Sequence, residues 1–582
     1  MFYLRRGGVF LCFLFSFAFL LCGFSRAARA QGVYQDDIQR AQAAMTPADW
    51  QNARQLFAAA QAANPDFLVE SVEEFVKINA WYRAFVDDGV IRHAFTMQWG
   101  DQIYCIDIRT QRALWAAGDD PNRLPQPPLI ARPVSAPPAA GERPKPTGSA
   151  GLDGSFDDLG RVRRCPAGSF PKLIPSIEKY YRFRTLADVF KKVPNSDIQP
   201  FPASRDIRST SGYDWSEASG DYFENYGLEA DFNLWQNYAQ FPIEHSLAEI
   251  WNLGDYFGGG DMQSAEAGIL HTIYVNGNDD MCLFIYFTAD AYQYTGCYNL
   301  DCAGFVQTDP SVVIGGPFAN YSEFGGDQYY VKIGFIRSGD GNWWLYINGE
   351  PIGYYPVSLY VGGAMSEHGD VLMYGGEVYE FPTAFVTLED MGSGRFSTAG
   401  WRNAAFVQNM QYYDLSLDAQ DALGLTPYAT NPTYWDIGAV HYSDDPNLAG
   451  VSLYYGGPGN TECNVTSCPL GCCDGNANCQ DGIDENACGA DGEACVQCEE
   501  GDICIDGDCE PSDDDVTPDD DATPDDDADD DTTPDDDSDD DTAPSDDDAA
   551  TDDDTVDDDF DDDDASPPSH DDDDSNSDCC GC

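Results

Sequence analysis

The sequence predicts an all-β protein built around an antiparallel β-sandwich between residues 213 and 462. Helical periodicity is scarce after Gly212, where aromatic residues, glycines and alternating patterns dominate. The segment Trp343 to Ile347, followed by Asn348-Gly349 and Ile352 to Tyr355, has the pattern of a β-hairpin with a tight turn. Many short strands with Gly-rich turns are typical of a sandwich. The other expected strands are Leu283 to Phe287, Tyr329 to Ile336, Val371 to Tyr374 and Val451 to Tyr455.

The first 30 residues have the pattern of a secretory signal peptide. Arg5 and Arg6 precede an apolar run from Val9 to Leu21, and Ala28-Arg29-Ala30 offers a cleavage site before Gln31. The run is too short to span a bilayer. Lipidation at Cys22 is the weaker alternative, because a lipobox needs a small residue where Leu21 stands. Export implies an oxidising compartment, so we expect the 20 cysteines to be paired rather than metal-bound.

Residues 31–205 form a smaller α+β region with a Pro-rich loop. The pattern is helical from Asp36 to Asp88, and Ser71-Val72-Glu73-Glu74 resembles a capping box that opens a helix through Trp81 and Phe85. A strand is expected at Ile103 to Ile108, before a Pro-rich stretch from Pro121 to Pro146. Because Cys105 and Cys165 flank this stretch, a disulfide closing the loop is the simplest use for both.

Residues 463–510 form a small module that disulfides must hold together. Ten cysteines lie between Cys463 and Cys509, with few large apolar residues between them. Their connectivity does not follow from the sequence. A zinc site at Cys495-Val496-Gln497-Cys498 is a weaker alternative in an exported, Asp-rich context.

Residues 511–582 are expected to be a disordered acidic tail that repeats Thr-Pro-Asp-Asp-Asp. The tail contains no Lys or Arg and holds roughly half of the net charge of −72, which argues against nucleic-acid binding. It lacks the spaced ligands and glycine of a calcium loop, so a solvated spacer is favoured over diffuse divalent-ion binding. The ending Cys579-Cys580-Gly581-Cys582 suggests an attachment point. The tail resembles cell-surface sorting regions of myxobacteria-like bacteria, although those usually continue into an apolar segment and basic residues. We therefore expect a secreted or cell-surface bacterial protein.

A search for catalytic residues leaves carboxylate chemistry. None of the six histidines forms the paired-His helix of a zinc protease, and Met391-Gly392-Ser393-Gly394 is not a nucleophile elbow. Cys282 lies in a strand expected to be buried, so we interpret it as a core residue. Two glutamates remain, Glu266 and Glu377, each among Ala or Gly neighbours in what we take to be a strand-edge setting. Such a setting suits the floor of a groove, although a glutamate of this kind is more often an ordinary surface residue.

An ordered series of motifs gives more specific evidence for a catalytic role of these glutamates. From about Tyr226 to Gly459 the chain resembles the neprosin family of secreted glutamic endopeptidases. The matching segments, in family order, are His245 to Trp251, Glu266-Ala267-Gly268, Thr288-Ala289-Asp290, Thr295 to Leu300, Cys302 to Gln307, Gly325 to Tyr329, Asn342-Trp343-Trp344, Gly353 to Pro356, Gly375 to Val378, Met391 to Gly394 and Tyr455 to Gly459.

The resemblance implies a function for the sandwich. It places the two catalytic residues at Glu266 and Glu377, on a concave face that binds peptide or protein substrates. It implies cleavage after proline at acid pH, without metal or cofactor, by a monomer. Two nearby carboxyl groups titrate separately, so one takes a proton from water and the other polarises the scissile carbonyl. We assign the base to Glu266 and the acid to Glu377, although the sequence does not fix which is which.

The resemblance also implies a latent form. Asp101 to Gln111 and Cys165 to Pro171 resemble the family's activation region, which supports the pairing of Cys105 with Cys165 and makes residues 31–205 an inhibitory pro-region. Cys297 and Cys302 match a family disulfide. We expect the activating cleavage between about Val193 and Asp221.

Two departures and two rival functions stay open. The family usually has Trp where this chain has Ile269, and often His where it has Arg395. Both residues could line the groove, so they put the proline preference in doubt. The first rival is a non-catalytic cell-surface sandwich that binds carbohydrate or protein. The second is a glycoside hydrolase, since paired carboxylates also serve there.

Overall fold

The computed structural model describes residues 32–97, 100–128, 144–146, 164–192, 212–220, 222–239, 244–257, 261–379, 389–443, 445–459 and short segments between 472 and 511. The expected signal peptide, most of the Pro-rich stretch, much of the expected cleavage region and the acidic tail lie outside these residues. Among the helices of the described part, none is long and apolar enough to cross a membrane.

The region that precedes the sandwich, for which we keep the name pro-region from the sequence prediction, begins with four helices. Ser71 caps the last of them, because its hydroxyl oxygen accepts a hydrogen bond from the Glu74 backbone N–H at 3.1 Å. The Glu74 carboxylate does not turn back as a full capping box requires. It accepts hydrogen bonds from the Lys77 ammonium at 2.7 Å and the Leu186 backbone N–H at 3.0 Å. The helices are α2 (Gly32–Ala44), α3 (Pro47–Trp50), α4 (Ala53–Ala63) and α5 (Val72–Val86).

A three-stranded antiparallel sheet completes the pro-region. Its order is β1 (Ile91–Thr96), β2 (Gln102–Asp107) and β4 (Ser169–Ile174). Cys105 on β2 forms a disulfide with Cys165, and their Cα atoms are 5.4 Å apart. Short helices follow these strands: η1 (Ile108–Thr110), α6 (Arg112–Ala117), α7 (Ile177–Tyr180) and η2 (Ala187–Phe190).

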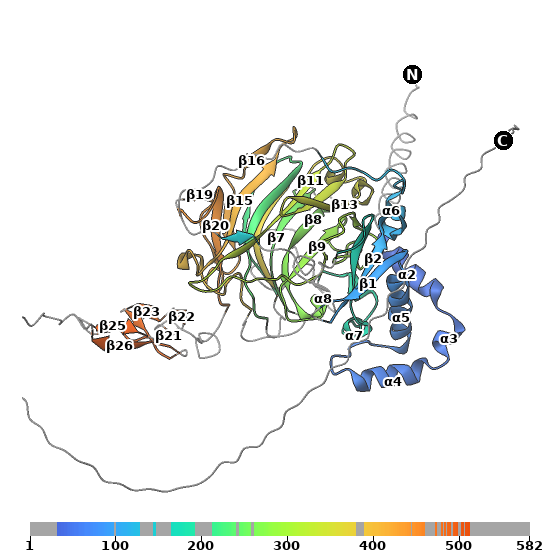
Figure 1. The fold of residues 1–582 in the computed structure, drawn as a ribbon, viewed down its shortest axis with the longest axis horizontal. Coiled ribbons are helices and arrows are strands. Elements are labelled where there is room, and N and C mark those ends of the chain that lie inside the picture. The colour runs from blue at the N-terminus through green and yellow to red at the C-terminus, as the bar shows by residue number, and fades with distance from the viewer. Residues whose placement is uncertain are drawn as a thin grey trace, which may run out of the picture. The chain divides into compact units, whose positions relative to one another are not determined.

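Two large sheets form the antiparallel β-sandwich that the sequence predicts (Figure 1). The six-stranded sheet has the order β17 (Thr426–Ala429), β5 (Tyr213–Ser219), β14 (Val371–Tyr379), β7 (His245–Gly254), β8 (Gln263–His271) and β9 (Cys282–Thr288). The main path of the 11-stranded sheet is β10 (Val306–Gln307), β13 (Glu350–Tyr355), β12 (Trp343–Ile347), β11 (Tyr329–Arg337), β6 (Gly227–Asn233), β15 (Ala405–Tyr413), β20 (Val451–Gly456) and β18 (Asp436–Ile437). Joined to this path are β16 (Ala419–Asp421), β19 (His441–Tyr442) and β3 (Lys145–Pro146).

The predicted hairpin joins β12 to β13. Its turn residues Asn348 and Gly349 both have positive φ, 49° and 90°, which is the backbone that a tight hairpin turn requires. Strand β3, from the end of the Pro-rich stretch, pairs in parallel with β11. This pairing was not predicted, because the stretch was expected to be an extended linker or loop.

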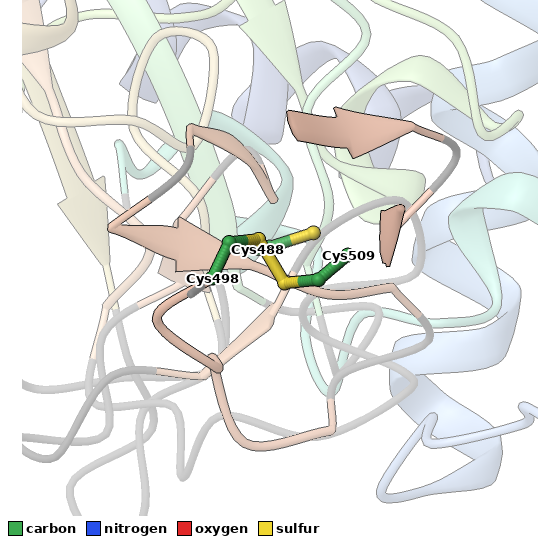
Figure 2. Close-up of side chains that lie close together, drawn as sticks. All are labelled: Cys488, Cys498 and Cys509. Carbon is green, nitrogen blue, oxygen red and sulfur yellow. A yellow bond between two sulfur atoms is a disulfide. The ribbon is translucent and has the colours of Figure 1, made fainter. Parts of the chain in front are cut away.

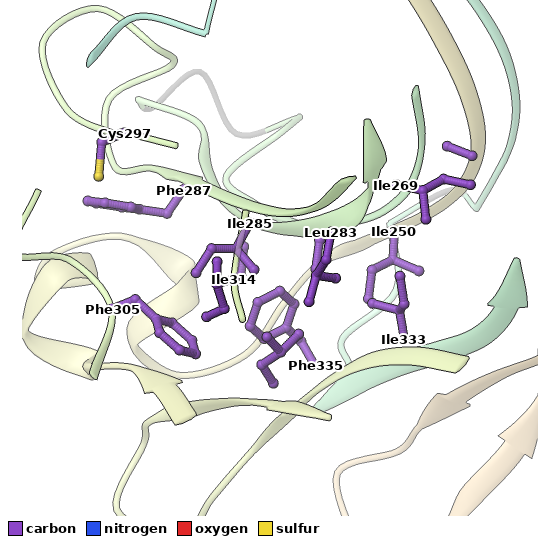
Figure 3. Close-up of a cluster of buried hydrophobic side chains, with 14 of the residues drawn as sticks. Ile250, Ile269, Leu283, Ile285, Phe287, Cys297, Phe305, Ile314, Ile333 and Phe335 are labelled. Carbon is purple, nitrogen blue, oxygen red and sulfur yellow. The ribbon is translucent and has the colours of Figure 1, made fainter. Parts of the chain in front are cut away.

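The main core lies between the two sheets. Ile250, Leu283 and Ile285 of the six-stranded sheet pack with Ile333 and Phe335 of β11 (Figure 3). The side chains are fully buried, and this burial of apolar surface is the largest favourable contribution to the sandwich. Cys282 is also buried and unpaired, as expected of a core residue rather than a nucleophile.

Strand alternation gives the six-stranded sheet a second, outer face. A separate cluster there includes Trp215, Leu247, Trp251 and Tyr286. Ile269 belongs to the other face, because it packs in the main core (Figure 3). Residues of opposite parity point to opposite faces, so Ile269 cannot share the face of Glu266. The suggestion that Ile269 lines the groove was wrong.

The disulfide-rich module consists of short hairpins. Its described disulfides join Cys472 to Cys495, Cys488 to Cys504 and Cys498 to Cys509. The sulfurs of Cys488, Cys498 and Cys509 lie close together (Figure 2). Because all three are in disulfides, they are not the thiolates that zinc binds. The hairpin strands are β21 (Cys472–Cys473), β22 (Cys479–Gln480), β23 (Ile483–Asp484), β24 (Ala487–Cys488), β25 (Asp502–Ile505) and β26 (Asp508–Pro511).

The two disulfides outside this module should differ in their effect on stability. The bond between Cys105 and Cys165 spans 60 residues, and the bond between Cys297 and Cys302 spans 5. Loop entropy predicts that double Ala replacement of the first pair lowers the free energy of unfolding by about 2 kcal/mol more than replacement of the second. Urea unfolding of both variants measures this difference. Equal losses would show that loop closure is not what these bonds contribute.

Candidate active site

Three glutamates occupy the outer face of three adjacent strands. Glu266 on β8 pairs with Trp251 of β7, and Glu377 on β14 pairs with Leu247 of β7. Glu249 lies on β7 itself, midway between these two partners. All three glutamates are fully buried. The strands β14, β7 and β8 are interior strands of their sheet, so the strand-edge setting expected for Glu266 and Glu377 was wrong.

Glycines form the floor around Glu249. Its cross-strand partners are Gly268 on β8 and Gly375 on β14. A Cβ at Gly268 would lie 2.1 Å from the Ala248 carbonyl oxygen and 2.5 Å from the Glu249 Cβ. A Cβ at Gly375 would lie 2.2 Å from the Ser216 carbonyl oxygen. The small residues beside the two predicted glutamates are therefore required by close packing at the centre of the sheet.

Two hydroxyl groups bind Glu266. Oε1 accepts hydrogen bonds from Ser264 and Tyr292, each at 2.5 Å. Tyr292 has a φ of 62°, a left-handed conformation that is strained for an aromatic residue. The Asp290 carboxylate holds this loop by accepting hydrogen bonds from three backbone N–H groups, those of Gln293, Tyr294 and Thr295. Burial and the neighbouring Glu266 raise the pKa of Tyr292 well above its usual value, so its hydroxyl keeps its proton.

Two ring N–H groups face Glu377. The Trp215 indole donates to Oε2 at 2.8 Å, and His245 Nε2 lies 3.0 Å from Oε1. Burial opposes ionisation of this carboxyl group, but Lys192, His245 and Trp215 outweigh it and lower the pKa of Glu377 below its usual value. An indole only donates hydrogen bonds, so this environment suits a carboxylate.

The cation at the centre of the site is Lys192, from the end of the described pro-region. Its fully buried ammonium lies 2.8 Å from Glu266 Oε2, 3.1 Å from Glu249 Oε1 and 3.7 Å from Glu377 Oε2. The backbone is held as well, since the Tyr298 hydroxyl donates to the Lys192 carbonyl at 2.9 Å and the Tyr286 hydroxyl to the Phe190 carbonyl at 3.1 Å. The pro-region therefore contacts all three glutamates through one side chain.

The charges of this cluster do not balance. Burial alone would lower the pKa of Lys192, but Glu249, Glu266 and Glu377 raise it well above its usual value, so the ammonium stays charged. The pKa of Glu249 is raised well above its usual value, first by burial and then by Glu266 and Glu377. One cation cannot offset three buried anions, and a proton on Glu249 reduces the excess.

The sequence prediction found part of this site. The structure brings Glu266 and Glu377 to one cation, and it pairs Cys297 with Cys302 in the segment that follows the Tyr292 loop. The prediction missed Glu249 and Lys192. Glu249 lies within the segment from His245 to Trp251 that resembles the family. Leu247, Glu249 and Trp251 are at alternate positions, so their side chains share one face of the strand, and this alternation could have indicated Glu249. Arg395 stacks on Phe324, with its guanidinium carbon 4.2 Å from the ring centroid.

Comparison with known proteins supports the resemblance. Residues 242–458 match the Neprosin family model. Solved structures of Scytalido-glutamic peptidase with a peptide-based transition state analog have 6% identity and a TM-score of 0.22, covering 42% of this chain and 97% of that one. SCP-B, a member of the Eqolisin family of peptidases in complex with the tripeptide Ala-Ile-His, has 5% identity and a TM-score of 0.21, covering 42% and 96%. The part of the sandwich that carries the three glutamates therefore lies within the segment that matches the Neprosin family model.

Proposed function

We propose that this protein is an exported glutamic peptidase that hydrolyses peptide bonds through Glu266 and Glu377. The Neprosin domain supports a peptidase, and the disulfides of the described residues support export. The single observation that carries the proposal is the meeting of both glutamates at one ammonium group. A water molecule in the position of that ammonium would reach both carboxyl groups. Cleavage after proline at acid pH is the finer part of the proposal and comes from the family resemblance.

The hydrogen bonds favour assigning the base to Glu377, the reverse of our expectation from the sequence. Trp215 can only donate, so Glu377 retains a preference for the ionised form after Lys192 leaves. The hydroxyls of Ser264 and Tyr292 can donate or accept, so they suit Glu266 in either protonation state. Glu266 can therefore carry the proton that polarises the scissile carbonyl.

The proposed reaction conserves its protons. Glu377 takes a proton from water while the water oxygen bonds to the scissile carbonyl carbon, and Glu266 gives its proton to the carbonyl oxygen. When the C–N bond breaks, Glu377 returns its proton to the leaving amine and the hydroxyl proton returns to Glu266. The products are a carboxylic acid and an amine, and both glutamates regain their starting states.

The pro-region supports a latent form. Lys192 occupies the position in which both glutamates would act, and hydroxyls of the site donate to the backbone carbonyls of Phe190 and of Lys192 itself. A substrate cannot reach Glu266 or Glu377 while this ammonium is in place. Activation then requires that Lys192 leave, and cleavage C-terminal to it, between about Val193 and Asp221, would free the segment.

Removal of either glutamate should abolish cleavage. Glu266→Gln and Glu377→Gln keep the side-chain shape but cannot exchange the protons, so we expect kcat of the processed enzyme to fall by at least about 100-fold. The assay is cleavage of a proline-containing peptide at acid pH, analysed by mass spectrometry. Glu350→Gln, on β13 of the other sheet, is the control.

Each alternative has its own outcome in the same assay. No cleavage by the unmodified enzyme would refute the peptidase. Full cleavage by both variants would refute the site. Release of sugar from a polysaccharide instead of peptide cleavage would favour the glycoside hydrolase.

Lys192→Met should weaken latency. Breaking a buried ion pair costs about 3 kcal/mol or more, which corresponds to a shift of about a hundredfold in the docking equilibrium of the segment. We expect the unprocessed variant to cleave peptide substrate much faster than the unprocessed unmodified chain. Lys191→Met is a matched control, because Lys191 is the adjacent lysine and pairs with Asp188 at 2.8 Å. Equal activity of all three unprocessed chains would contradict the inhibitory role.

Latency should also weaken in acid. The pKa of Glu377 is lowered from 4.5, so its ion pair with Lys192 stabilises docking above that value and is lost as the pH falls through the lowered pKa. The pKa of Glu249 is raised by burial and by the other two glutamates rather than by Lys192, so its shift does not define this window. The ratio of unprocessed to processed activity should therefore rise as the pH falls below 4.5. A ratio that does not change with pH in this range would contradict the ion-pair account.

A further inference from the structure

Glu249 is a buried carboxyl group at the site to which the proposed reaction gives no role. Its side chain is fully buried, and its Oε1 lies 3.1 Å from the Lys192 ammonium. Its Oε2 has no hydrogen-bond partner among the described residues. An ionised oxygen in that position would carry a large desolvation cost. A glutamate that served only to fill the sheet would be replaced at lower cost by an apolar residue.

The register places Glu249 between the two proposed catalytic residues. Glu377 and Glu266 pair with Leu247 and Trp251, which are four residues apart on β7, or about 13 Å along an extended strand. Glu249 is two residues from each partner and lies on the intervening strand. The side chains of Glu266 and Glu377 therefore converge over Glu249, and Lys192 touches all three.

The two cross-strand neighbours of Glu249 are glycines. Gly268 and Gly375 are its partners on both sides, so no side chain from β8 or β14 covers its carboxyl group in that row. Both glycines belong to the short motifs around Glu266 and Glu377. Gly375, Glu249 and Gly268 thus form one row across three strands, and the Lys192 ammonium contacts this row at Glu249.

We propose that Glu249 is a third carboxyl group of the reaction centre, which hydrogen-bonds the attacking water between Glu266 and Glu377. This inference rests on the proposed peptidase function. Glu249 touches the water directly and keeps its own proton throughout, so the proton balance between Glu266 and Glu377 is unchanged. Its contribution is to orient the water towards the scissile carbonyl.

The groups that face Glu249 favour its neutral form. Lys192 contacts Glu249 in the unprocessed chain, and Glu266 and Glu377 flank it on β8 and β14. The charge of Glu249 also raises the pKa of Tyr292 and Tyr298. Burial raises the pKa of Glu249, and the two neighbouring glutamates raise it further. Among the described residues, Lys192 is the cation that opposes these effects. Once it has left, burial and the two neighbouring glutamates favour a proton on Glu249.

Two substitutions in the processed enzyme test this role. Glu249→Gln keeps a neutral donor and acceptor of the same shape, so kcat should stay within about threefold of the unmodified value. Glu249→Leu removes the hydrogen bond to water, so kcat should fall about 100-fold while KM changes little. Glu217→Leu is the control, because Glu217 is a buried glutamate of β5 that pairs with Gly375 in the same row.

The pH profile separates a role in the reaction from a structural one. Ionisation of Glu249 at higher pH would remove its donor and add a charge beside Glu377, which produces an alkaline limb in kcat. Gln has no such proton to lose, so Glu249→Gln should move this limb to higher pH. If thermal unfolding shows that Glu249→Leu does not fold, the test rests on the pH of the alkaline limb in the kcat profile of Glu249→Gln.

Failure of this inference differs from failure of the peptidase function. If Glu266→Gln and Glu377→Gln are inactive, but folded Glu249→Leu keeps kcat within about threefold, Glu249 has no part in the reaction. An unmoved alkaline limb in Glu249→Gln would overturn the inference as well. If both Glu249 variants activate the unprocessed chain and leave the processed enzyme unchanged, Glu249 only anchors Lys192. No cleavage by the unmodified enzyme would overturn the peptidase function itself.

Discussion

One buried ammonium group faces three buried carboxyl groups, and the arrangement of the site depends on this imbalance. Charges removed from water must be paired or neutralised, because their desolvation cost is large. Lys192 meets Glu249, Glu266 and Glu377 at a single point, so the latent chain tolerates three acidic groups in an apolar sheet face. The same contact fixes the end of the pro-region against the sandwich. In the proposed function, latency and the reaction centre therefore have one physical basis.

The alternation of the sheet explains how such a cluster is possible. One face of the six-stranded sheet supplies the sandwich core, and the other carries the glutamates among aromatic side chains. Moving a strand by one residue would exchange the faces and bury the glutamates in the main core. The register of β8, β7 and β14 is thus constrained twice, by the apolar residues of one face and by the acidic residues of the other.

The sequence predicted the sandwich because strand alternation and hairpin turns are local signals. The β12–β13 hairpin and its Asn348-Gly349 turn illustrate this. Their small neighbours made Glu266 and Glu377 possible site residues, and the family motifs made them specific. Their strand-edge setting was wrong because the small neighbours were interpreted as a feature of a groove at a strand edge. Gly268 and Gly375 are small because neighbouring strands approach closely there. Lys192 could not have been predicted, since its contact with Glu266 joins positions 74 residues apart.

The hydrogen-bond donors around Glu377 and Glu266 differ, and this difference affects which of the two carboxyl groups more readily loses its proton. Trp215 can stabilise only an acceptor, so its contact with Glu377 favours the loss of a proton there. Ser264 and Tyr292 impose no such direction on Glu266, because a hydroxyl adapts to either state. Once the ammonium has left, repulsion disfavours the simultaneous ionisation of neighbouring buried carboxyl groups. The proposed assignment of roles rests on these contacts and not on Lys192, so it applies to the proposed processed enzyme as well as to the proposed latent chain.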